Sequence, residues 1–454
     1  MAKIKKPIQV PKGTFDILPD DQKYWKKVRS AVSDVAQSYG FGRIDTPMFE
    51  YSDLYMASVG EATDVVEKQM YSFKSKGGDM LSLRPEGTAG VARAYIENGM
   101  TNLPQPVNLY YTGPMFRYEQ PQAGRFRQFH QAGLEIIGDM DPIYDAEVIN
   151  AFVVICRELG LQNLNVEMNT IGCNKCRSDF RSQLLRYYKP RAAKLCRDCK
   201  RRLKENPLRL LDCKEEKCEQ LKAHAPNLID HLCEECHSHF KAVLEYLDET
   251  EIPYSLNPHL VRGFDYYTKT VFEVFLEDEH IVGDDGHPRT EKAEQSSYDG
   301  GNEKTHRRSK LALGGGGRYD NLVKLLGGKD APAVGTGLGL DRVIGAMKQQ
   351  GVKVPPIYKP DVFLVQLGAL SKKKCLKLYE ELRQAGIAVA ESFGKDSIKT
   401  QLHAADRDGV ALSLILGQKE VIDGVVIVRD MASGAQETVP LEKVIKIIQD
   451  KLKK

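Results

Sequence analysis

Hydrophobic residues recur at a helical spacing near the start of the chain and at strand spacings after it. Residues 21–39 place Trp25, Val28, Val32 and Val35 on one face of an amphipathic helix. The pattern then predicts an extended segment broken at a proline, FGRIDTPMFE, and a hairpin around a Gly-Gly turn at 71–83. A helix N-terminus follows at RPEGTAGVARAYI. After it come two strands at 107–119 and 125–138, a helix at 144–159 and a strand at LNVEMNT.

The pattern changes twice further along the chain. Residues 173–252 consist of short helical segments rich in Cys, Lys, Arg and Glu, whereas residues 253–350 return to strand and helix signals. Within the latter, residues 277–310 are polar and poor in apolar residues, which predicts a solvated or disordered loop. The sequence therefore predicts a core in two parts, 1–172 and 253–350, interrupted by an insertion domain.

The C-terminal part of the chain alternates strands and helices regularly. After a Pro-rich linker at 351–360, the strands DVFLVQLG, IAVAESF, ALSLILG and VVIVRD alternate with helices at 371–385, 395–408 and 440–453. This alternation predicts that residues 361–454 form a compact α/β domain.

Composition narrows the class of protein without identifying a partner. The chain has 454 residues, 42% hydrophobic and 28% charged, which is typical of a globular protein of several domains. The net charge of +3 permits nucleic-acid binding without requiring it. The start, MAKIKKPIQVPKG, has no apolar segment typical of a secretory signal, and the apolar runs are far shorter than the roughly 20 residues that cross a bilayer. We therefore expect a cytoplasmic protein with no membrane contact.

Eight of the ten cysteines fall into four close pairs, which favours metal ligands over disulfides in a chain of this kind. The pairs are Cys173 and Cys176, Cys196 and Cys199, Cys213 and Cys218, and Cys233 and Cys236. Eight thiolates could form two tetrahedral zinc sites, but the pairing stays open, and reduced, partly buried thiols on a helical module are the alternative. A zinc-dependent nucleic-acid-binding module is a further interpretation, because the basic tract KLCRDCKRRLK lies within this region.

Several arginines lie on and between the two strands predicted at 107–119 and 125–138. Arg117 and Glu119 lie on the first, and Arg125 and Arg127 on the second, followed by Gln131 and Glu135. Arginine forks suit phosphates, so such a sheet face predicts a polar ligand; a solvated face with ion pairs is equally compatible. GTGLGLDR and GGGGRYD lack the spacing of a dinucleotide fingerprint or a P-loop, and each alone could be a close-packed strand turn. Arg342, however, places a cation where a helix follows a glycine-rich strand.

Together these segments resemble the class II aminoacyl-tRNA synthetases. FGRIDTPMFE is similar to their motif 1, FRYE with GRFRQFHQ to motif 2 and GTGLGLDR to motif 3, while LVRGFDYY resembles the signature of the histidyl-tRNA synthetase family. LRPEGT and GGGGRYD fit that family too, and the resemblance spans nearly the whole chain in the family's order. It implies an α+β catalytic domain around a mixed, mainly antiparallel sheet, a helical Cys-rich insertion and a C-terminal α/β anticodon-binding domain.

The resemblance implies a histidine–tRNA ligase that forms histidyl-adenylate from L-histidine and ATP, with Mg²⁺, and transfers histidine to the 3′ end of tRNA(His). It also implies a homodimer formed through motif 1. The implied catalytic residues are Arg262, Arg117 and Arg342, and the implied ATP-binding residues are Arg117, Glu119, Arg125, Phe129 and Arg342. The implied histidine-binding residues are Glu86, Gly87, Thr88, Arg117, Gln131, Glu135, Arg262, Tyr266 and Tyr267.

The chain departs from the family pattern at a few positions. Gln120 and Gln69 replace a common Arg and a common Glu, the 277–310 insert is longer than usual, and the cysteine pairs are not universal, so that any zinc would be structural. A histidine-sensing relative without ligase activity, such as the regulatory subunit of ATP phosphoribosyltransferase, is the alternative function. Such proteins typically lack the anticodon domain and the ATP-binding arginines, and both are present here.

The adjacent phenols of Tyr266 and Tyr267 raise a geometric question. Neighbouring side chains on a strand point to opposite faces. Either the backbone turns at this pair, or only one phenol reaches the ligand.

Overall fold

The computed structural model describes residues 8–60, 63, 65–120, 125–213, 215–277 and 310–453. The chain divides into two compact units at residues 354 and 355, and each is described by itself. The polar loop predicted at 277–310 lies outside the described residues except for Glu277 and Lys310, which belong to strands. Among the helices described, none has the length and apolar character needed to cross a bilayer.

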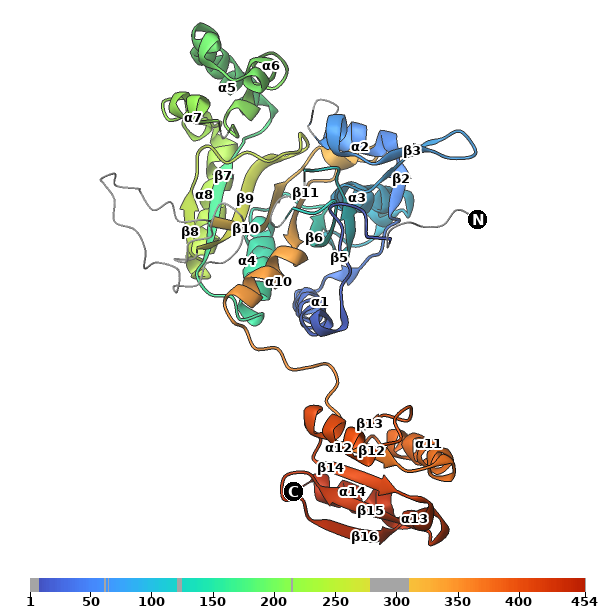
Figure 1. The fold of residues 1–454 in the computed structure, drawn as a ribbon. Helices are drawn as coiled ribbons and strands as arrows, with labels where there is room; N and C mark the ends of the chain where they lie inside the picture. Colours follow the sequence, from blue (N-terminus) through green and yellow to red (C-terminus); the bar gives the residue numbers. More distant parts are fainter. Residues whose placement is uncertain are drawn as a thin grey trace, which may run out of the picture. The chain divides into compact units, whose positions relative to one another are not determined.

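The first unit is built on an eight-stranded sheet in the order β1-β5-β6-β11-β10-β9-β7-β8 (Figure 1). The strands are β1 Gly42–Arg43, β5 Val107–Phe116, β6 Gln128–Ile137, β7 Leu164–Thr170, β8 Tyr254–Leu256, β9 Thr268–Glu277, β10 Lys310–Arg318 and β11 Ala333–Gly339. The β1–β5 and β7–β8 pairs at the two edges are parallel and the central pairs are antiparallel. The prediction of a mixed, mainly antiparallel sheet is therefore confirmed.

Helices cover both faces of this sheet. The helices α1 Gln22–Ser38, α4 Ile143–Glu158 and α10 Leu340–Gln349 pack on one face, where the four apolar residues predicted for α1 are all buried. The other face carries α3 Thr88–Glu97, next to α2 Ser52–Val59, the short helix α9 Leu322–Leu325 and a small sheet. That small sheet has the order β2-β4-β3, with β2 Phe49–Tyr51, β3 Ser72–Lys74 and β4 Met80–Leu83. The neighbouring Tyr110 and Tyr111 of β5 belong to different cores, as the alternation of a strand requires.

The strands predicted at 107–119 and 125–138 are shorter than expected: the first ends at Phe116, and the second begins at Gln128. Arg117, Glu119, Arg125 and Arg127 therefore lie beyond the strand ends, not on the sheet face. The cause is hydrogen bonding to segments distant in sequence: the Tyr118 amide donates to the Gln69 carbonyl, and the Arg127 amide donates to the Gly13 carbonyl. Regular pairing of β5 with β6 therefore stops at Phe116 and Gln128, and beyond it the Arg117 amide still donates to the Arg127 carbonyl at 2.9 Å.

Residues 173–252, called here the Cys-rich module, connect β7 to β8 with short helices, as predicted. They are α5 Asn174–Tyr188, α6 Arg197–Glu205, α7 Glu216–Lys222 and α8 Glu234–Glu249, with the 3₁₀ turn η5 Pro207–Leu210 between α6 and α7. Helix α8 packs against α4 of the sheet domain, where His239 lies 3.3 Å from the buried Asp145. The module therefore contacts the sheet domain directly at its C-terminal end.

The second unit has a five-stranded sheet in the order β13-β12-β14-β15-β16. Its elements are β12 Val362–Gln366, α11 Ala369–Gln384, β13 Val389–Glu391, α12 Ile398–Arg407, β14 Leu412–Leu416, α13 Gln418–Ile422, β15 Val425–Asp430, β16 Gln436–Pro440 and α14 Val444–Leu452. The four predicted strands are present. The edge strand β16 was not predicted, because four of its five residues are exposed and it lacks an apolar pattern.

Candidate active site and cysteine clusters

Glycines in β11 make room for polar side chains from β6. Gly335 is paired with Glu135 and Gly337 with Gly133. A Cβ atom on Gly335 would lie 1.7 Å from Glu135 Oε2, and one on Gly337 would lie 2.0 Å from Gln131 Nε2. The glycine-rich segment is thus closely packed, and what it packs against is the row formed by Gln131 and Glu135.

The carboxylate of Glu135 is fully buried and accepts two hydrogen bonds from other elements. Thr88 Oγ1 donates to one oxygen at 2.7 Å, and the Tyr319 hydroxyl donates to the other at 2.5 Å. Burial raises the pKa of Glu135 to about 8, and these two hydrogen bonds oppose the rise. Tyr319 was not assigned a role from the sequence, although its place in GGGGRYD, directly after the glycine-rich strand, was a signal.

Glu86 is a second buried carboxylate, and it caps the N-terminus of α3. It accepts hydrogen bonds from the amides of Thr88 at 2.6 Å and Ala89 at 2.9 Å. Burial raises the pKa of Glu86, while the two amides and the charge of Arg117 oppose the rise. Gly87 is required for close approach, since a Cβ atom there would lie 2.2 Å from the Tyr111 ring.

The guanidinium of Arg117 lies between two aromatic rings. It is 5.2 Å from the centroid of Phe129 and 5.5 Å from that of Phe264, and its Nε donates to the Pro85 carbonyl at 2.9 Å. Burial lowers the pKa of Arg117, and the carboxylates of Glu119 and Glu86 oppose that change. Phe264 was not predicted as a site residue, although it lies within the segment LVRGFDYY.

Tyr266 and Tyr267 lie at a backbone turn that ends before β9 begins at Thr268. The turn allows both phenols to lie in one buried cluster, with ring centroids 4.6 Å apart. Burial is the main cause that raises the pKa of each hydroxyl. The first of the two geometric alternatives is therefore the correct one.

Arg262 and Arg342 lie on the same face of the glycine-rich strands as Gln131 and Glu135: a Cβ atom on Gly315 would lie 3.1 Å from Arg262 Nη1, and one on Gly339 would lie 3.6 Å from Arg342 Cδ. Arg262 lies 5.8 Å from the Tyr267 ring and 3.6 Å from the Glu273 carboxylate, and its buried Nε has no hydrogen-bond partner among the described residues. Burial lowers the pKa of Arg262, but Tyr267 and Glu273 raise it above the ordinary value. Arg342 donates to the Ala312 carbonyl at 2.9 Å, and burial followed by the charge of Arg125 lowers its pKa.

These residues form one electrostatically connected cluster. The charges of Glu86 and Arg262 both act on Arg117, and those of Arg262, Arg125 and Glu119 act on Arg342. Arg125 lies at the rim, with a half-exposed side chain 3.6 Å from Glu119. Three guanidiniums on one side and two buried carboxylates with phenols on the other suit a ligand pair in which one partner is anionic and the other carries amino or imidazole nitrogens.

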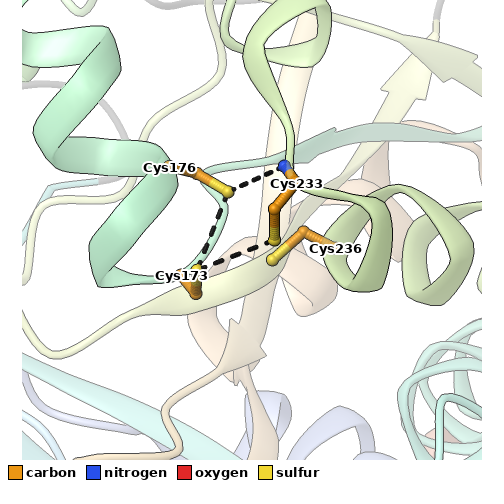
Figure 2. Close-up of side chains that lie close together, drawn as sticks. All are labelled: Cys173, Cys176, Cys233 and Cys236. Atoms are coloured by element: carbon orange, nitrogen blue, oxygen red, sulfur yellow. Dashed lines mark hydrogen bonds between the residues drawn. The ribbon is translucent and has the colours of Figure 1, made fainter.

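The eight paired cysteines form two separate clusters of four. Cys173, Cys176, Cys233 and Cys236 come from the N-termini of α5 and α8, and Figure 2 shows their sulfurs turned toward one another. The second cluster, Cys196, Cys199, Cys213 and Cys218, lies inside the module and is fully buried. The first cluster thus brings the cysteine pair at the start of the module together with the pair nearest its end. The sequence alone had left this pairing open.

The sulfur distances fit a tetrahedral ion. Sγ–Sγ distances are 3.7 Å for Cys173–Cys176, 4.0 Å for Cys173–Cys233 and 3.8 Å for Cys196–Cys213. A tetrahedron with zinc–sulfur bonds of about 2.3 Å has edges of about 3.8 Å, whereas a disulfide needs about 2.05 Å. All eight thiols are free, and the donor set therefore fits zinc.

Comparison with known proteins identifies families that match both units. The family described as Histidyl-tRNA synthetase matches residues 13–286, and the one described as Anticodon binding domain matches residues 361–451. A relative named histidine–tRNA ligase from Dehalococcoides mccartyi is 43% identical over 96% of this chain and 98% of its own length. A relative of the same name from Desulforamulus reducens is 42% identical over 97% of this chain and 98% of its own.

A solved structure gives the same result. The apo histidyl-tRNA synthetase of S. aureus superposes with a TM-score of 0.77 at 33% identity, covering 97% of this chain and all of that one (100%).

Proposed function

The chain belongs to the histidyl-tRNA synthetase family and is a histidine–tRNA ligase, and we propose that the buried cluster around Arg117 is where histidine and ATP react. This assignment rests on one observation: three guanidiniums and two buried carboxylates lie together beside the glycine-rich strands β10 and β11. The reaction has two steps. The histidine carboxylate attacks the α-phosphorus of ATP and pyrophosphate leaves; then a hydroxyl at the 3′ end of tRNA attacks the carbonyl of histidyl-adenylate and AMP leaves.

The arginine side of the cluster is the proposed ATP subsite. ATP enters as its Mg²⁺ complex, Phe129 stacks on the adenine, and Glu119 accepts a hydrogen bond from its edge. Arg117 and Arg262 contact the α-phosphate, where negative charge builds as pyrophosphate leaves, and Arg342 and Arg125 hold the remaining phosphates. Fixed guanidiniums need no reorganisation when that charge develops, so positioning and charge stabilisation suffice without a protein nucleophile.

The carboxylate side is the proposed histidine subsite. Thr88 contacts both Glu135 and Glu86, and Gln131 lies further along the same face of β6. The ionised form of Glu135 would bind the α-ammonium group or an imidazole N–H. Tyr266 and Tyr267 supply hydroxyls that can donate to or accept from the ring nitrogens. A pocket built on such groups rejects amino acids that cannot pair with them, by a factor of about 10⁴–10⁵ where a hydrogen-bonding group is missing.

Pyrophosphate exchange tests the proposal directly. The purified protein should incorporate labelled pyrophosphate into ATP only when histidine is added. Exchange driven by a different amino acid would overturn the histidine subsite. Histidine binding without exchange would instead favour the histidine-sensing alternative.

We assign one structural zinc ion to each cysteine cluster. The ions would hold the short helices of the module together, since the described residues of the module form no strand and its core contains the four thiols of the second cluster. Elemental mass spectrometry of protein prepared without chelator should find two zinc atoms per chain. A metal-free protein with the same thermal stability would refute the assignment.

We also propose that two chains associate through motif 1. Met48, Phe49 and Tyr51 lie on or beside β2, an edge strand, and are 53%, 53% and 63% exposed. Adjacent exposed apolar side chains on an unpaired edge suit a second copy of the chain. Phe49→Glu should shift sedimentation toward the monomer, and an unchanged profile would exclude this edge.

The remaining assignments follow the predicted boundaries. Residues 1–172 and 253–350 form the catalytic core, 173–252 the insertion, 351–360 the linker and 361–454 the anticodon-binding domain. We place the enzyme in the cytoplasm, where tRNA, ATP and reduced thiols occur together.

A further inference from the structure

The loop formed by residues 261–267 carries three groups of the proposed active site and is held from outside by the Cys-rich module. Tyr266 and Tyr267 lie in the buried cluster, and Arg262 lies 5.8 Å from the Tyr267 ring. On the outer side of the loop a cavity of about 370 Å³ lies between the loop and the module; Arg177, Arg181, Arg209 and Asp265 line it, and Arg262, Phe264 and Tyr267 border it as well. Close packing therefore does not fix the outer side of this loop, and its polar contacts must do so.

Three residues of the module make those contacts. Arg177 Nη1 donates to the Tyr267 carbonyl at 3.1 Å, and Arg209 Nη2 donates to the Gly263 carbonyl. Asn206 donates to the Asp265 carboxylate at 3.0 Å, and the Asp265 amide in turn donates to the Val59 carbonyl of the sheet domain at 3.1 Å.

Each of the three residues lies close in sequence to a proposed zinc ligand. Arg177 directly follows Cys176 of the first cluster on α5. Asn206 and Arg209 lie in the segment between Cys199 and Cys213, both members of the second cluster, and this segment forms the end of α6 and η5. The positions of the three donors are therefore set by the same short segments that the two thiol clusters hold.

We propose that Arg177, Arg209 and Asn206 are positioning residues for amino-acid activation, through which the metal-bound module holds Arg262 and the two tyrosines in their reactive arrangement. The proposal rests on the proposed function of the pocket. It adds that the module acts in adenylate formation itself, before any tRNA is bound. Loss of either zinc ion would reduce activation without altering a residue that touches substrate.

Loss of one of these positioning residues should change kcat and KM for histidine but not KM for ATP. The loop carries Arg262 and the tyrosines, whereas Arg117, Phe129 and Arg342 are held by other elements. Arg177→Met keeps the apolar stem and removes the donors. We expect it to lower kcat of histidine-dependent pyrophosphate exchange and to raise KM for histidine, each by about tenfold to a hundredfold as for a misplaced catalytic group, with KM for ATP within about twofold.

Matched variants control for general destabilisation. Arg181→Met removes another arginine that lines the same cavity on α5 and has no hydrogen bond to the loop, and it should leave all three constants unchanged. Arg209→Met should repeat the pattern of Arg177→Met from the second cluster. Arg177→Lys should restore part of kcat, because a lysine can still donate to the Tyr267 carbonyl. Should Arg177→Met lose zinc or unfold, Arg209→Met and Asn206→Ala provide the same comparison.

Removal of zinc from the wild-type enzyme by a chelator completes the experiment. It should produce the same split between kcat, KM for histidine and KM for ATP, and zinc added back should reverse it. Equal changes in both KM values, or unchanged exchange in Arg177→Met and Arg209→Met that retain their zinc, would overturn the proposal. A wild-type enzyme without histidine-dependent exchange would instead refute the proposed function.

Discussion

The proposed catalytic pocket, called the pocket below, and the Cys-rich module both bury polar groups, but they satisfy them by different means. In the pocket, Glu86 accepts two backbone amides and Glu135 accepts two hydroxyls, so each carboxylate is paired by the protein. In the module, the nearest groups to the Cys173 and Cys196 sulfurs include other cysteine sulfurs at 3.7–4.0 Å. A long sheet with a helix N-terminus beside it can satisfy buried carboxyl groups by itself, whereas the short helices of the module would depend on the proposed zinc ions.

The largest expected effect comes from removing one ligand of the buried cluster. Structural zinc contributes roughly 10–16 kcal/mol to the folding of small domains, so Cys213→Ser should release one zinc atom per chain and unfold the module locally. Hydrogen exchange should show lost protection in α6 and α7 but not in β5 and β6. Cys375→Ser, a buried cysteine of the second unit, should keep both metal ions and serves as the control. If Cys213→Ser retained two zinc atoms per chain, Cys213 would not be a zinc ligand, and the proposed contrast between an ion-held module and a protein-paired pocket would fail.

In the pocket, the largest effect should follow the loss of the Arg262 charge. Arg262→Gln should lower kcat of pyrophosphate exchange by about 10²–10³, as for other groups that stabilise transition-state charge, and change histidine affinity much less. Arg407→Gln, in the exposed last turn of α12, should leave exchange unchanged. An equal loss of rate and affinity would mean that Arg262 binds substrate and transition state alike.

Substitution of a close-packed glycine in β11 should have a smaller and more local effect. Gly335→Ala would place a methyl group 1.7 Å from Glu135 Oε2, so Glu135 or the strand must move. Since a displacement of about 1 Å can cost about 10²-fold in rate, we expect that loss in kcat/KM for histidine. Gly345→Ala, in α10 with open space around its Cβ position, should instead raise the melting temperature slightly without changing activity. If Gly335→Ala and Gly345→Ala had the same effect, the close packing at Gly335 would not shape the pocket.

The sequence predicted the elements of the fold better than the contacts that join them. Helices and strands followed from periodicity, and the proposed site residues were read from motifs, because both are local properties of the chain. Arg117, Glu119, Arg125 and Arg127 were misplaced because the amides of Tyr118 and Arg127 bond to Gln69 and Gly13, which lie far away in sequence. Tyr319 and Phe264 were missed for a similar reason: their contacts with Glu135 and Arg117 join separate elements.

The cysteine clusters show the same limit. Four close pairs were readable from spacing, but the pairing of the first with the fourth and the second with the third depends on how the module closes on itself. Nothing in the segment 173–252 alone indicates that Arg177 or Arg209 reaches the backbone of residues 261–267.

The smallest expected effect is a pH dependence that belongs to the pocket alone. Burial raises the pKa of Glu135 from its ordinary 4.5 to about 8, so the folded protein holds a proton there that the unfolded chain has lost. The resulting stability is fully present below about pH 4.5 and is lost as the pH rises toward 8, with a slope of at most about 1.4 kcal/mol per pH unit. Unfolding in denaturant between pH 5 and 8, without histidine, measures this slope.

Glu135→Gln isolates that contribution. Glu86, whose pKa is also raised, adds a slope of the same sign that remains in the variant. The wild-type protein should therefore lose more stability than Glu135→Gln across this range, and the difference between them belongs to Glu135. Histidine should reduce the difference, because its α-ammonium group favours the ionised carboxylate and binding would release the proton. Identical slopes in the two proteins would show that Glu135 is ionised in the free enzyme, and that the pocket satisfies its carboxylates more fully than its burial implies.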